Sequence, residues 1–300
     1  MTEPLWEDEG RPRVAAMGPV KVRVPAKINL HLGVGPLRDD GFHELVTIYH
    51  AIALYDELTA RPADSLALTM DGEGAGQLAL DDTNLVIRAV KTFAAVTGRE
   101  PHARLHLRKQ IPLAAGLAGG SADAAATLVA CDALWSTGYT REDLASVAAT
   151  LGSDIPFFLL PGAVRCTGRG EILEPVAPPP ALPVVLLKPS FGVATPDAYK
   201  RWKDAEPLPG IAYDPQRFPW GELVNDLEKP VFQKHRFLAE AKQWLLDRPE
   251  TAGALMSGSG STMFAVLRDP AGAEALIAAA RAELDPTLWA WSGFTDGAPN

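Results

Sequence analysis

The chain has 300 residues, of which 47% are hydrophobic and 22% charged, a composition typical of a folded globular protein. Its length allows one large domain and favours two domains of ordinary size. The net charge of −9 argues against a protein that binds nucleic acid irrespective of sequence, so any nucleotide ligand should be a small one.

Cysteines and apolar runs narrow the class of protein further. The two cysteines, Cys131 and Cys166, lack zinc-ligand spacing and indicate a reducing compartment, with Cys131 a core residue. No stretch is apolar over 18 residues, and the first residues are acidic where a signal peptide would be basic. We therefore expect a cytoplasmic protein without a membrane segment, beginning with a disordered extension over residues 1–20.

From residue 21 to residue 35 apolar and polar residues alternate, which predicts a long amphipathic strand, bent at Pro25. Lys27 and Asn29 lie side by side on its polar face. A solvated sheet face is the ordinary interpretation of such residues. A turn follows over residues 35–41, and residues 45–58 read as a further strand.

A strand over residues 103–108 leads into a glycine-rich loop and a helix. Before it, we expect a helix over residues 84–97, capped by Asp82-Thr83 and closed by Gly98. The loop, residues 112–122, holds three glycines and four alanines, so a ligand could approach its backbone N–H groups closely. A helix over residues 122–135, capped by Ser121 or Asp123, would place its positive end there.

The strand, loop and helix together are the setting of a phosphate site. The loop lacks the Lys-Ser/Thr pair of a Walker A motif and the spacing of a dinucleotide fingerprint. The alternative is a loop that is rich in glycine only because two elements pack tightly there.

The next helix, residues 144–151, starts from a capping-box-like Thr140 and ends at Gly152. Asp154 stands between Gly152 and Pro156, before an apolar run, where it serves either as an acidic group at the edge of the core or as a helix N-cap. A hairpin over residues 162–170 is followed by the proline-dense stretch 175–183, the natural domain boundary.

The remaining chain predicts a strand over residues 184–188, helices near 196–203 and 234–247, two strands around 256–262, a helix over 270–284 and a strand near 288–294. Without the additional helix, the order is βαββαβ, which is the ferredoxin-like arrangement.

Three separated features resemble the GHMP kinase superfamily of small-molecule kinases: Lys27 and Asn29 on the polar face of a strand, the glycine-rich loop before a helix, and Asp154. Residues 112–121 match its phosphate loop, Pro-x-x-x-Gly-Leu-x-x-Gly-Ser, and residues 256–264 resemble its third, glycine-rich motif. Within the superfamily, residues 25–30 (Pro-Ala-Lys-Ile-Asn-Leu), 40–43 (Asp-Gly-Phe-His) and 151–156 (Leu-Gly-Ser-Asp-Ile-Pro) are similar to the branch that phosphorylates cytidine-diphosphate-linked methylerythritol. The similarity keeps this order from about residue 21 to residue 266.

The resemblance implies an α+β protein with the two-domain GHMP kinase fold. Residues 21–175 would form the N-terminal kinase domain, a ribosomal-S5-domain-2-like ATP-binding domain, and residues 184–300 the C-terminal ferredoxin-like domain. ATP and Mg²⁺ would be the cofactors. The partner would be the small-molecule substrate, with no nucleic acid and no membrane, and the protein a monomer or weak homodimer.

The resemblance also assigns roles to individual residues. Asp154 would accept the proton of the attacking hydroxyl, while Lys27 stabilises the transferred charge. The substrate would contact Asn29, the rings of Phe42 and Tyr199, His43 at the base edge, and Thr195. The ATP phosphates would lie on Pro112, Leu113, Ala114, Ala115, Gly116, Leu117, Ala118, Gly119, Gly120, Ser121 and Ala122. The metal ligands stay unassigned.

Three positions depart from the family pattern: Phe42 replaces a commoner tyrosine, Ala118 a glycine, and Ala122 a hydroxyl-bearing or similar small residue. The methyl group of Ala118 requires a negative φ there, and Ser121 can supply the lost hydroxyl. Two other functions stay open. One is a superfamily kinase for mevalonate, homoserine or a sugar, and the other is a non-catalytic nucleotide-binding protein on the same scaffold.

Overall fold

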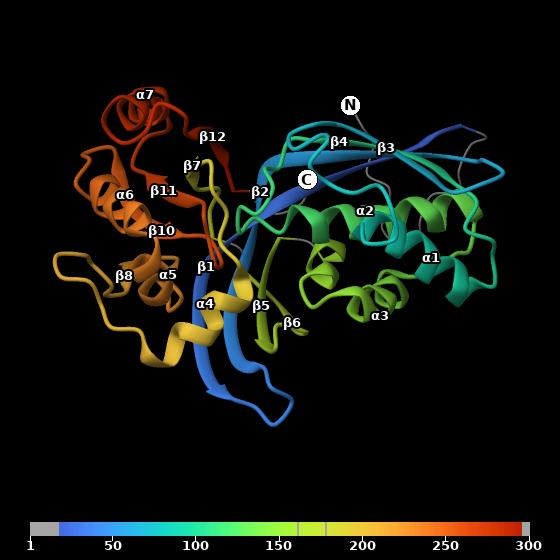
Figure 1. The fold of residues 1–300 in the computed structure, drawn as a ribbon, viewed down its shortest axis with the longest axis horizontal. Coiled ribbons are helices and arrows are strands. Elements are labelled where there is room, and N and C mark those ends of the chain that lie inside the picture. Colours follow the sequence, from blue (N-terminus) through green and yellow to red (C-terminus); the bar gives the residue numbers. More distant parts are fainter. Residues whose placement is uncertain (1–17, 161, 178, 296–300) are drawn as a thin grey trace. The chain divides into compact units, whose positions relative to one another are not determined.

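A computed structural model describes residues 18–160, 162–177 and 179–295 (Figure 1). The chain forms two compact units. Unit 1 comprises residues 1–26, 54–113 and 118–160, and unit 2 comprises residues 27–53, 114–117 and 161–300. The units alternate along the sequence because the long strands β1 (Val20–Leu37) and β2 (His43–Arg61) each contribute to both. Residues 1–17 of the expected N-terminal extension lie outside the described residues, and Val20 already belongs to β1.

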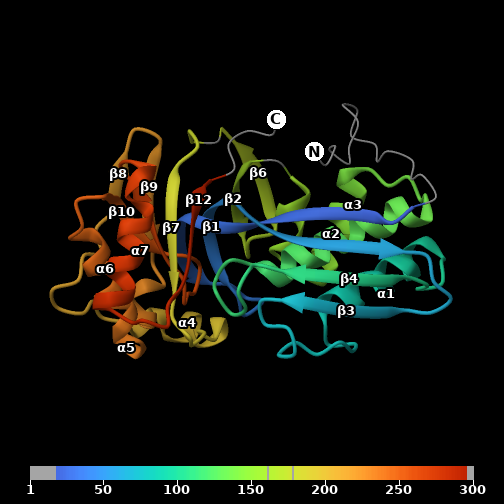
Figure 2. The ribbon, with the colours of Figure 1, turned by 90° about the horizontal axis from the view of Figure 1, so that it is seen from above.

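In unit 1 the strands pair in the order β3, β4, β2 and β1, which Figure 2 shows side by side. β4 (Arg104–Lys109) is antiparallel to β2 and parallel to β3 (Ala67–Gly72), a strand that the sequence analysis did not anticipate. The helices are α1 (Leu85–Thr97), α2 (Gly119–Trp135), α3 (Arg141–Leu151) and the short 3₁₀ helix η1 (Ile155–Leu159).

The capping predictions for α1 and α3 have different outcomes. Thr140 caps α3 through a complete capping box, as predicted. The prediction that Asp82-Thr83 caps α1 is wrong. Asn84 is the N-cap and accepts a hydrogen bond from the Val86 N–H at 2.9 Å, while Asp81 accepts from Thr83 in the preceding turn. Gly98 closes α1 in the left-handed conformation, φ 63°, as expected.

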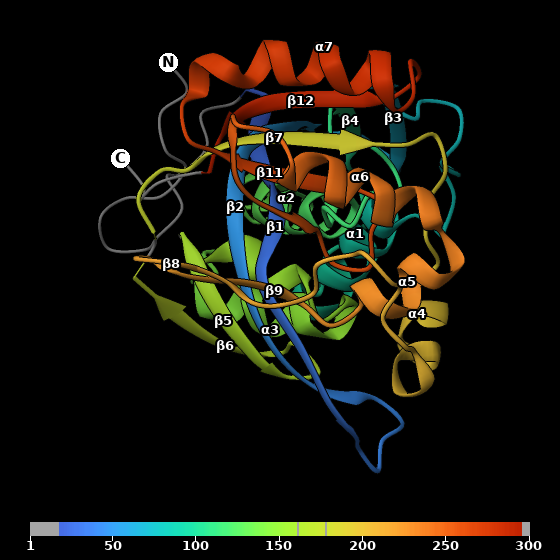
Figure 3. The same cartoon turned by 90° about the vertical axis from the view of Figure 1, so that its left-hand side faces the viewer.

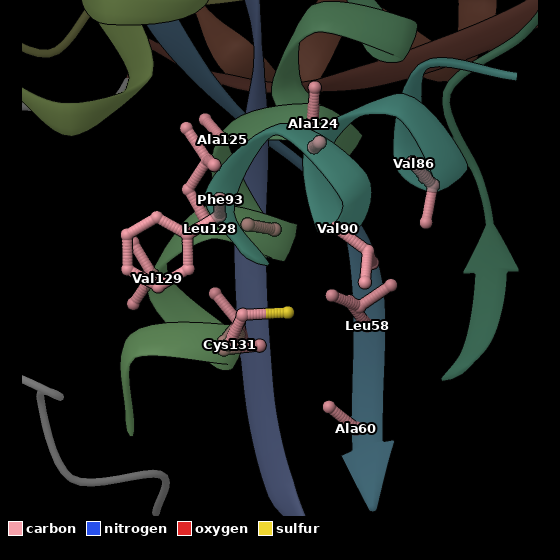
Figure 4. Packing of buried hydrophobic residues seen from close by; sticks show 14 of the residues in the cluster. Leu58, Ala60, Val86, Val90, Phe93, Ala124, Ala125, Leu128, Val129 and Cys131 are labelled. Atoms are coloured by element: carbon pink, nitrogen blue, oxygen red, sulfur yellow. The ribbon is translucent and has the colours of Figure 1, made fainter. Parts of the chain in front are cut away.

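The core of unit 1 lies between its helices and its sheet. Figure 4 shows Phe93 and Val90 of α1, Leu128 and Cys131 of α2, and Leu58 of β2 within one cluster. Cys131 is fully buried there, as predicted. Alanines dominate the buried positions of α2, so other elements can approach its backbone closely.

In unit 2 the ferredoxin-like prediction is confirmed. β7 (Pro183–Lys188), β10 (Thr251–Met256), β11 (Met263–Leu267) and β12 (Trp289–Phe294) form an antiparallel sheet in the order β10-β11-β7-β12. Figure 3 shows β11, β7 and β12 side by side. The helices include α4 (Thr195–Arg201), followed by η2 (Trp202–Asp204), and α6 (Arg236–Leu246), η3 (Pro270–Gly272) and α7 (Ala273–Glu283).

Two further groups of elements complete unit 2. The first part of β2 pairs with the hairpin β5 (Ala163–Gly168) and β6 (Ile172–Val176). The expected loop after α4 instead holds the hairpin β8 (Gln216–Phe218) and β9 (Gly221–Asn225), and α5 (Glu228–Lys234) follows. β9 runs parallel to β1, with Asn225 opposite Leu32. Among the described residues, no helix combines the length and apolar character needed to cross a membrane.

Candidate active site

Strand β1 buries the two polar residues that its alternation singled out. Lys27 is 4% exposed and Asn29 is 2% exposed, although Lys21 and Arg23 on the same face are exposed. A solvated sheet face is therefore excluded for Lys27 and Asn29. A buried ammonium group needs polar partners, because leaving it unpaired away from water costs several kcal/mol or more.

The Lys27 ammonium contacts three groups of unit 2. Its Nζ donates to Asn29 Oδ1 at 2.6 Å and to the carbonyl oxygen of Gly116 at 2.9 Å, and it lies 5.0 Å from the centroid of the Tyr49 ring. Asn29 Nδ2 in turn donates to the Thr47 hydroxyl at 2.8 Å. The ammonium group is thus held in one place, against the carbonyl of the predicted phosphate loop.

The middle of that loop, residues 114–117, packs against the glycine-rich turn between β10 and β11. Ser257 Oγ donates to the Gly116 carbonyl at 3.0 Å, and the Thr262 N–H donates to the Ala115 carbonyl at 3.2 Å. Gly116 has φ 74°, and a Cβ there would lie 2.1 Å from the carbonyl oxygen of Ser257. Close packing of two elements therefore explains why residue 116 is glycine, as the alternative interpretation of the loop expected.

The rest of the loop and the start of α2 belong to unit 1, and the helix begins earlier than predicted. α2 starts at Gly119 after Ala118, and no side chain caps it, so neither Ser121 nor Asp123 has the predicted capping role. Ala118 has φ 55°, which corrects the expectation of a negative φ. An uncapped first turn with glycine at positions 119 and 120 leaves backbone N–H groups available for an anion.

Beneath this first turn lies a buried cluster of one lysine and two aspartates. Lys109 Nζ donates to Asp123 Oδ2 at 2.7 Å and to Asp56 Oδ2 at 2.5 Å. Asp56 Oδ1 also accepts from two backbone N–H groups, of Gln110 and Ile111, at 2.6 and 2.9 Å. Asp123 Oδ1 is buried and has no hydrogen-bond partner among the described residues. Asp56 is therefore the better hydrogen-bonded carboxylate of the two.

The two carboxyl groups share one ammonium, so burial favours a proton on the carboxyl group with fewer hydrogen bonds, which is that of Asp123. Burial raises the pKa of Asp123 to about 8, although the attraction of Lys109 lowers it. The pKa of Lys109 is also raised: burial lowers it, but the two carboxylates outweigh burial. The directions of these shifts favour a charged Lys109 and a proton on the Asp123 carboxyl group.

This proton predicts a pH dependence of stability. The folded pKa of Asp123 lies above its unfolded value, so the native state holds a proton that the unfolded chain releases. Its contribution to the free energy of unfolding is complete below about pH 4 and falls, by at most about 1.4 kcal/mol per pH unit, until pH 8. Asp123→Asn should remove this decline in denaturant titrations at pH 5, 6.5 and 8. If the free energy of unfolding changes with pH equally in the wild type and in Asp123→Asn, then Asp123 is ionised at all three pH values.

Asp154 lies in unit 1, directly before η1. Its backbone occupies the N-cap position, but its side chain makes no capping hydrogen bond to that helix. The N-cap explanation of its carboxylate is therefore wrong. Pro156 and the buried Ile155 and Phe157 anchor the segment that follows it.

The predicted base-binding residues come together in part. The rings of His43 and Tyr199 stack with centroids 6.3 Å apart and planes inclined by 22°, and Trp202 meets His43 edge-on at 5.3 Å. His43 Nδ1 lies 2.9 Å from the Gly35 carbonyl. The Thr195 and Ser259 hydroxyls are hydrogen-bonded at 2.7 Å, which joins the start of α4 to the glycine-rich turn.

Phe42 occupies a more exposed position in unit 2. The residue is 54% exposed, and the Arg169 guanidinium lies 5.0 Å from the centroid of its ring. The sequence analysis assigned no role to Arg169 or Trp202. Neither lies in a motif that would have revealed it, because each meets its partner ring through tertiary contacts.

Two family models match the chain: the N-terminal domain of GHMP kinases over residues 84–162 and the C-terminal domain of GHMP kinases over residues 217–285. A protein of Salinispora arenicola named 4-diphosphocytidyl-2-C-methyl-D-erythritol kinase is 53% identical over 296 residues, which cover 91% of each chain. A protein of the same name from Streptomyces avermitilis is 40% identical, over 87% of this chain and 92% of the relative.

Solved structures agree with these relatives. A crystal structure of 4-(cytidine 5'-diphospho)-2C-methyl-D-erythritol kinase superposes with a TM-score of 0.75 at 34% identity, covering 93% of this chain and all of the other. Homoserine kinase from Cytophaga hutchinsonii shares the fold, with a TM-score of 0.65 at 19% identity over 93% of this chain and 95% of that one. On the identity and coverage of these relatives, the chain belongs to the 4-diphosphocytidyl-2-C-methyl-D-erythritol kinase family of GHMP kinases.

Proposed function

We propose that this chain transfers the γ-phosphoryl group of ATP to the 2-hydroxyl of 4-diphosphocytidyl-2-C-methyl-D-erythritol, in the non-mevalonate route to isoprenoids. The observation that carries the proposal is the buried Lys27 ammonium, held at the Gly116 carbonyl of the phosphate loop. Binding of a nucleotide alone does not require a desolvated cation in that position, whereas phosphoryl transfer uses one to neutralise charge. The names of the relatives support the choice of substrate.

In this proposal Asp154 accepts the proton of the attacking hydroxyl, and Lys27 stabilises charge on the phosphoryl group. Phosphoryl transfer through a loose transition state asks mainly for alignment and charge neutralisation, so a strong base is not required. The hydrogen bonds of Lys27 to Asn29 and Gly116 fix its ammonium before substrate binds. Such preorganisation is what makes a charge effective in a water-poor site.

The uncapped first turn of α2 fits the phosphates of ATP, since its free N–H groups and partial positive charge favour an anion. Mg²⁺ is usually held by one or two carboxylates together with substrate phosphates and water. The described residues contain no group of three or more His, Cys, Asp or Glu side chains able to hold a metal ion. This suits a cation that arrives with ATP and supplies charge neutralisation on its phosphates.

His43 is suited to read the edge of cytosine. The Gly35 carbonyl can only accept a hydrogen bond, so the neutral ring carries its hydrogen on Nδ1. Nε2 is then an acceptor, which matches the exocyclic amino group of cytosine. The stacked Tyr199 ring and the exposed Phe42 ring offer the flat apolar faces that a base needs.

The test is ADP release from ATP and Mg²⁺ with the cytidylyl-methylerythritol substrate, in parallel with mevalonate, homoserine and galactose. Turnover with the first compound alone is the expected result. Turnover with one of the other compounds would support kinase activity and refute the assignment of the cytosine-binding residues. No turnover with all four would favour a non-catalytic nucleotide-binding protein.

Phe42→Ala should raise the KM for the cytidylyl substrate, by on the order of 10-fold for a stacking contact of about 1–3 kcal/mol, and leave the KM for ATP unchanged. Leu37→Ala is the matched control, because Leu37 is also an exposed apolar side chain, 64% accessible, next to the same turn. Initial-rate kinetics with each substrate varied in turn would measure both constants. A change confined to the KM for ATP would show that Phe42 is wrongly assigned.

A further inference from the structure

The segment Asn225–Glu228, at the end of β9, has no role in the sequence analysis, yet three of its four side chains accept or donate hydrogen bonds to the backbone of β1, of β10 or of the turn after β10. Asn225 Nδ2 donates to the carbonyls of Met256 at 2.7 Å and Gly258 at 2.8 Å, and its Oδ1 accepts from the Leu227 N–H at 2.9 Å. Glu228 Oε1 accepts from the Met256 N–H at 3.0 Å. Asp226 Oδ2 accepts from the Val34 N–H of β1 at 2.9 Å.

These bonds tie the glycine-rich turn, residues 257–261, to the strand that carries Lys27. Asn225 lies opposite Leu32 in the parallel pairing of β9 with β1, and the Asp226 N–H donates to the Leu32 carbonyl at 2.9 Å. The amide of Asn225 is buried, and it donates one hydrogen bond to Met256, the last residue of β10, and one to Gly258 in the turn. Asn225 thus links the turn to β9, the strand paired with β1, while Ser257, Ser259 and Ser261 bond the turn to other segments.

The glycine-rich turn also contacts the Lys27 ammonium and the Gly116 carbonyl that accepts from it. A Cβ on Gly258 would lie 3.3 Å from Lys27 Nζ, Asn29 Oδ1 and the Gly116 carbonyl alike, so the turn backbone packs directly on this group. Ser257 Oγ donates to the same Gly116 carbonyl at 3.0 Å. A shift of the turn would move Ser257 and Gly258 away from the Lys27 ammonium.

We infer that Asn225 is a positioning residue for phosphoryl transfer, which acts by holding the turn 257–261 against Lys27 and Gly116. The inference rests on the proposed function, in which Lys27 faces the transferred group. Asparagine suits this position because one side chain must donate twice and accept once. An aspartate of the same size could not donate, and its charge would face two carbonyl oxygens.

The experiment compares Asn225→Asp and Asn225→Ser with Gln216→Glu. Gln216 is a matched control, because Gln216 Nε2 donates to the Ala254 carbonyl of the same strand β10 at 2.7 Å, farther from the turn. Each variant loses a side-chain amide donor: Gln216→Glu loses the bond to Ala254 in β10, and the Asn225 variants lose bonds to Met256 at the end of β10 and to Gly258 in the turn. We expect kcat to fall about 10- to 100-fold in the Asn225 variants with both KM values nearly unchanged, and to stay close to wild type in Gln216→Glu.

A second readout does not depend on activity. The rate at which an acylating reagent modifies the Lys27 amine, measured by mass spectrometry relative to the exposed Lys21, should rise in the Asn225 variants and not in Gln216→Glu. Asn225→Ser keeps one donor, so it serves if Asn225→Asp does not fold. Unchanged Lys27 labelling, or equal kcat in Asn225→Ser and Gln216→Glu, would overturn the inference. Absence of turnover in the wild type would instead refute the proposed function, and the labelling would still decide the role of Asn225.

Discussion

Asp154→Asn should lower kcat by about 100- to 10,000-fold, the usual contribution of a positioned proton acceptor. Asparagine has the same shape but cannot take up the proton of the attacking hydroxyl. Because asparagine keeps the size and shape of aspartate and the lost bond is not a helix cap, the variant should fold. KM values for both substrates should change little, since the group acts in the transition state.

Steady-state kinetics would measure kcat and KM of the variant, and thermal unfolding would measure its stability. Asp64→Asn is a suitable control, because Asp64 is an exposed aspartate of the same unit. Turnover of Asp154→Asn within about threefold of wild type, far below the usual effect, would refute the catalytic role of Asp154. A large fall in the unfolding temperature would point to a structural role.

Lys27→Met should lower kcat by about 100- to 1,000-fold, comparable to the removal of one preorganised electrostatic group. Methionine has a similar length and leaves no buried charge, so the variant should fold. Asn29 Oδ1 loses the ammonium donor, whereas the Gly116 carbonyl still accepts from Ser257. A destabilisation of about 1–3 kcal/mol is expected from the unsatisfied acceptor.

Lys21→Met provides the control on the same strand. Lys21 and Lys27 lie on the same face of β1, but Lys21 is exposed and Lys27 is buried. Equal rates for the two variants would mean that the charge of Lys27 does not assist transfer. A defect limited to the KM for ATP would show that Lys27 contributes to binding alone.

The elements with strong periodicity were predicted correctly from sequence. The alternation of β1, the cap at Gly98 and the order of the ferredoxin-like strands are all present in the structure. The short strands β8 and β9 were missed, as was β3, because segments of this length have too few residues to show a clear period. The first residue of α2 was placed too late, because glycine is a poor helix former and the run at positions 119–120 read as loop.

The sequence by itself determined the family, through the residue types and spacing at Lys27, Asn29, Asp154 and the glycine-rich loop. Only the tertiary structure decided how those groups are held. Burial of Lys27 beside Gly116 and the sharing of Lys109 by two aspartates both depend on residues distant in sequence. Motif spacing records local backbone geometry, whereas desolvation and long-range hydrogen bonds arise only when separate strands and turns meet.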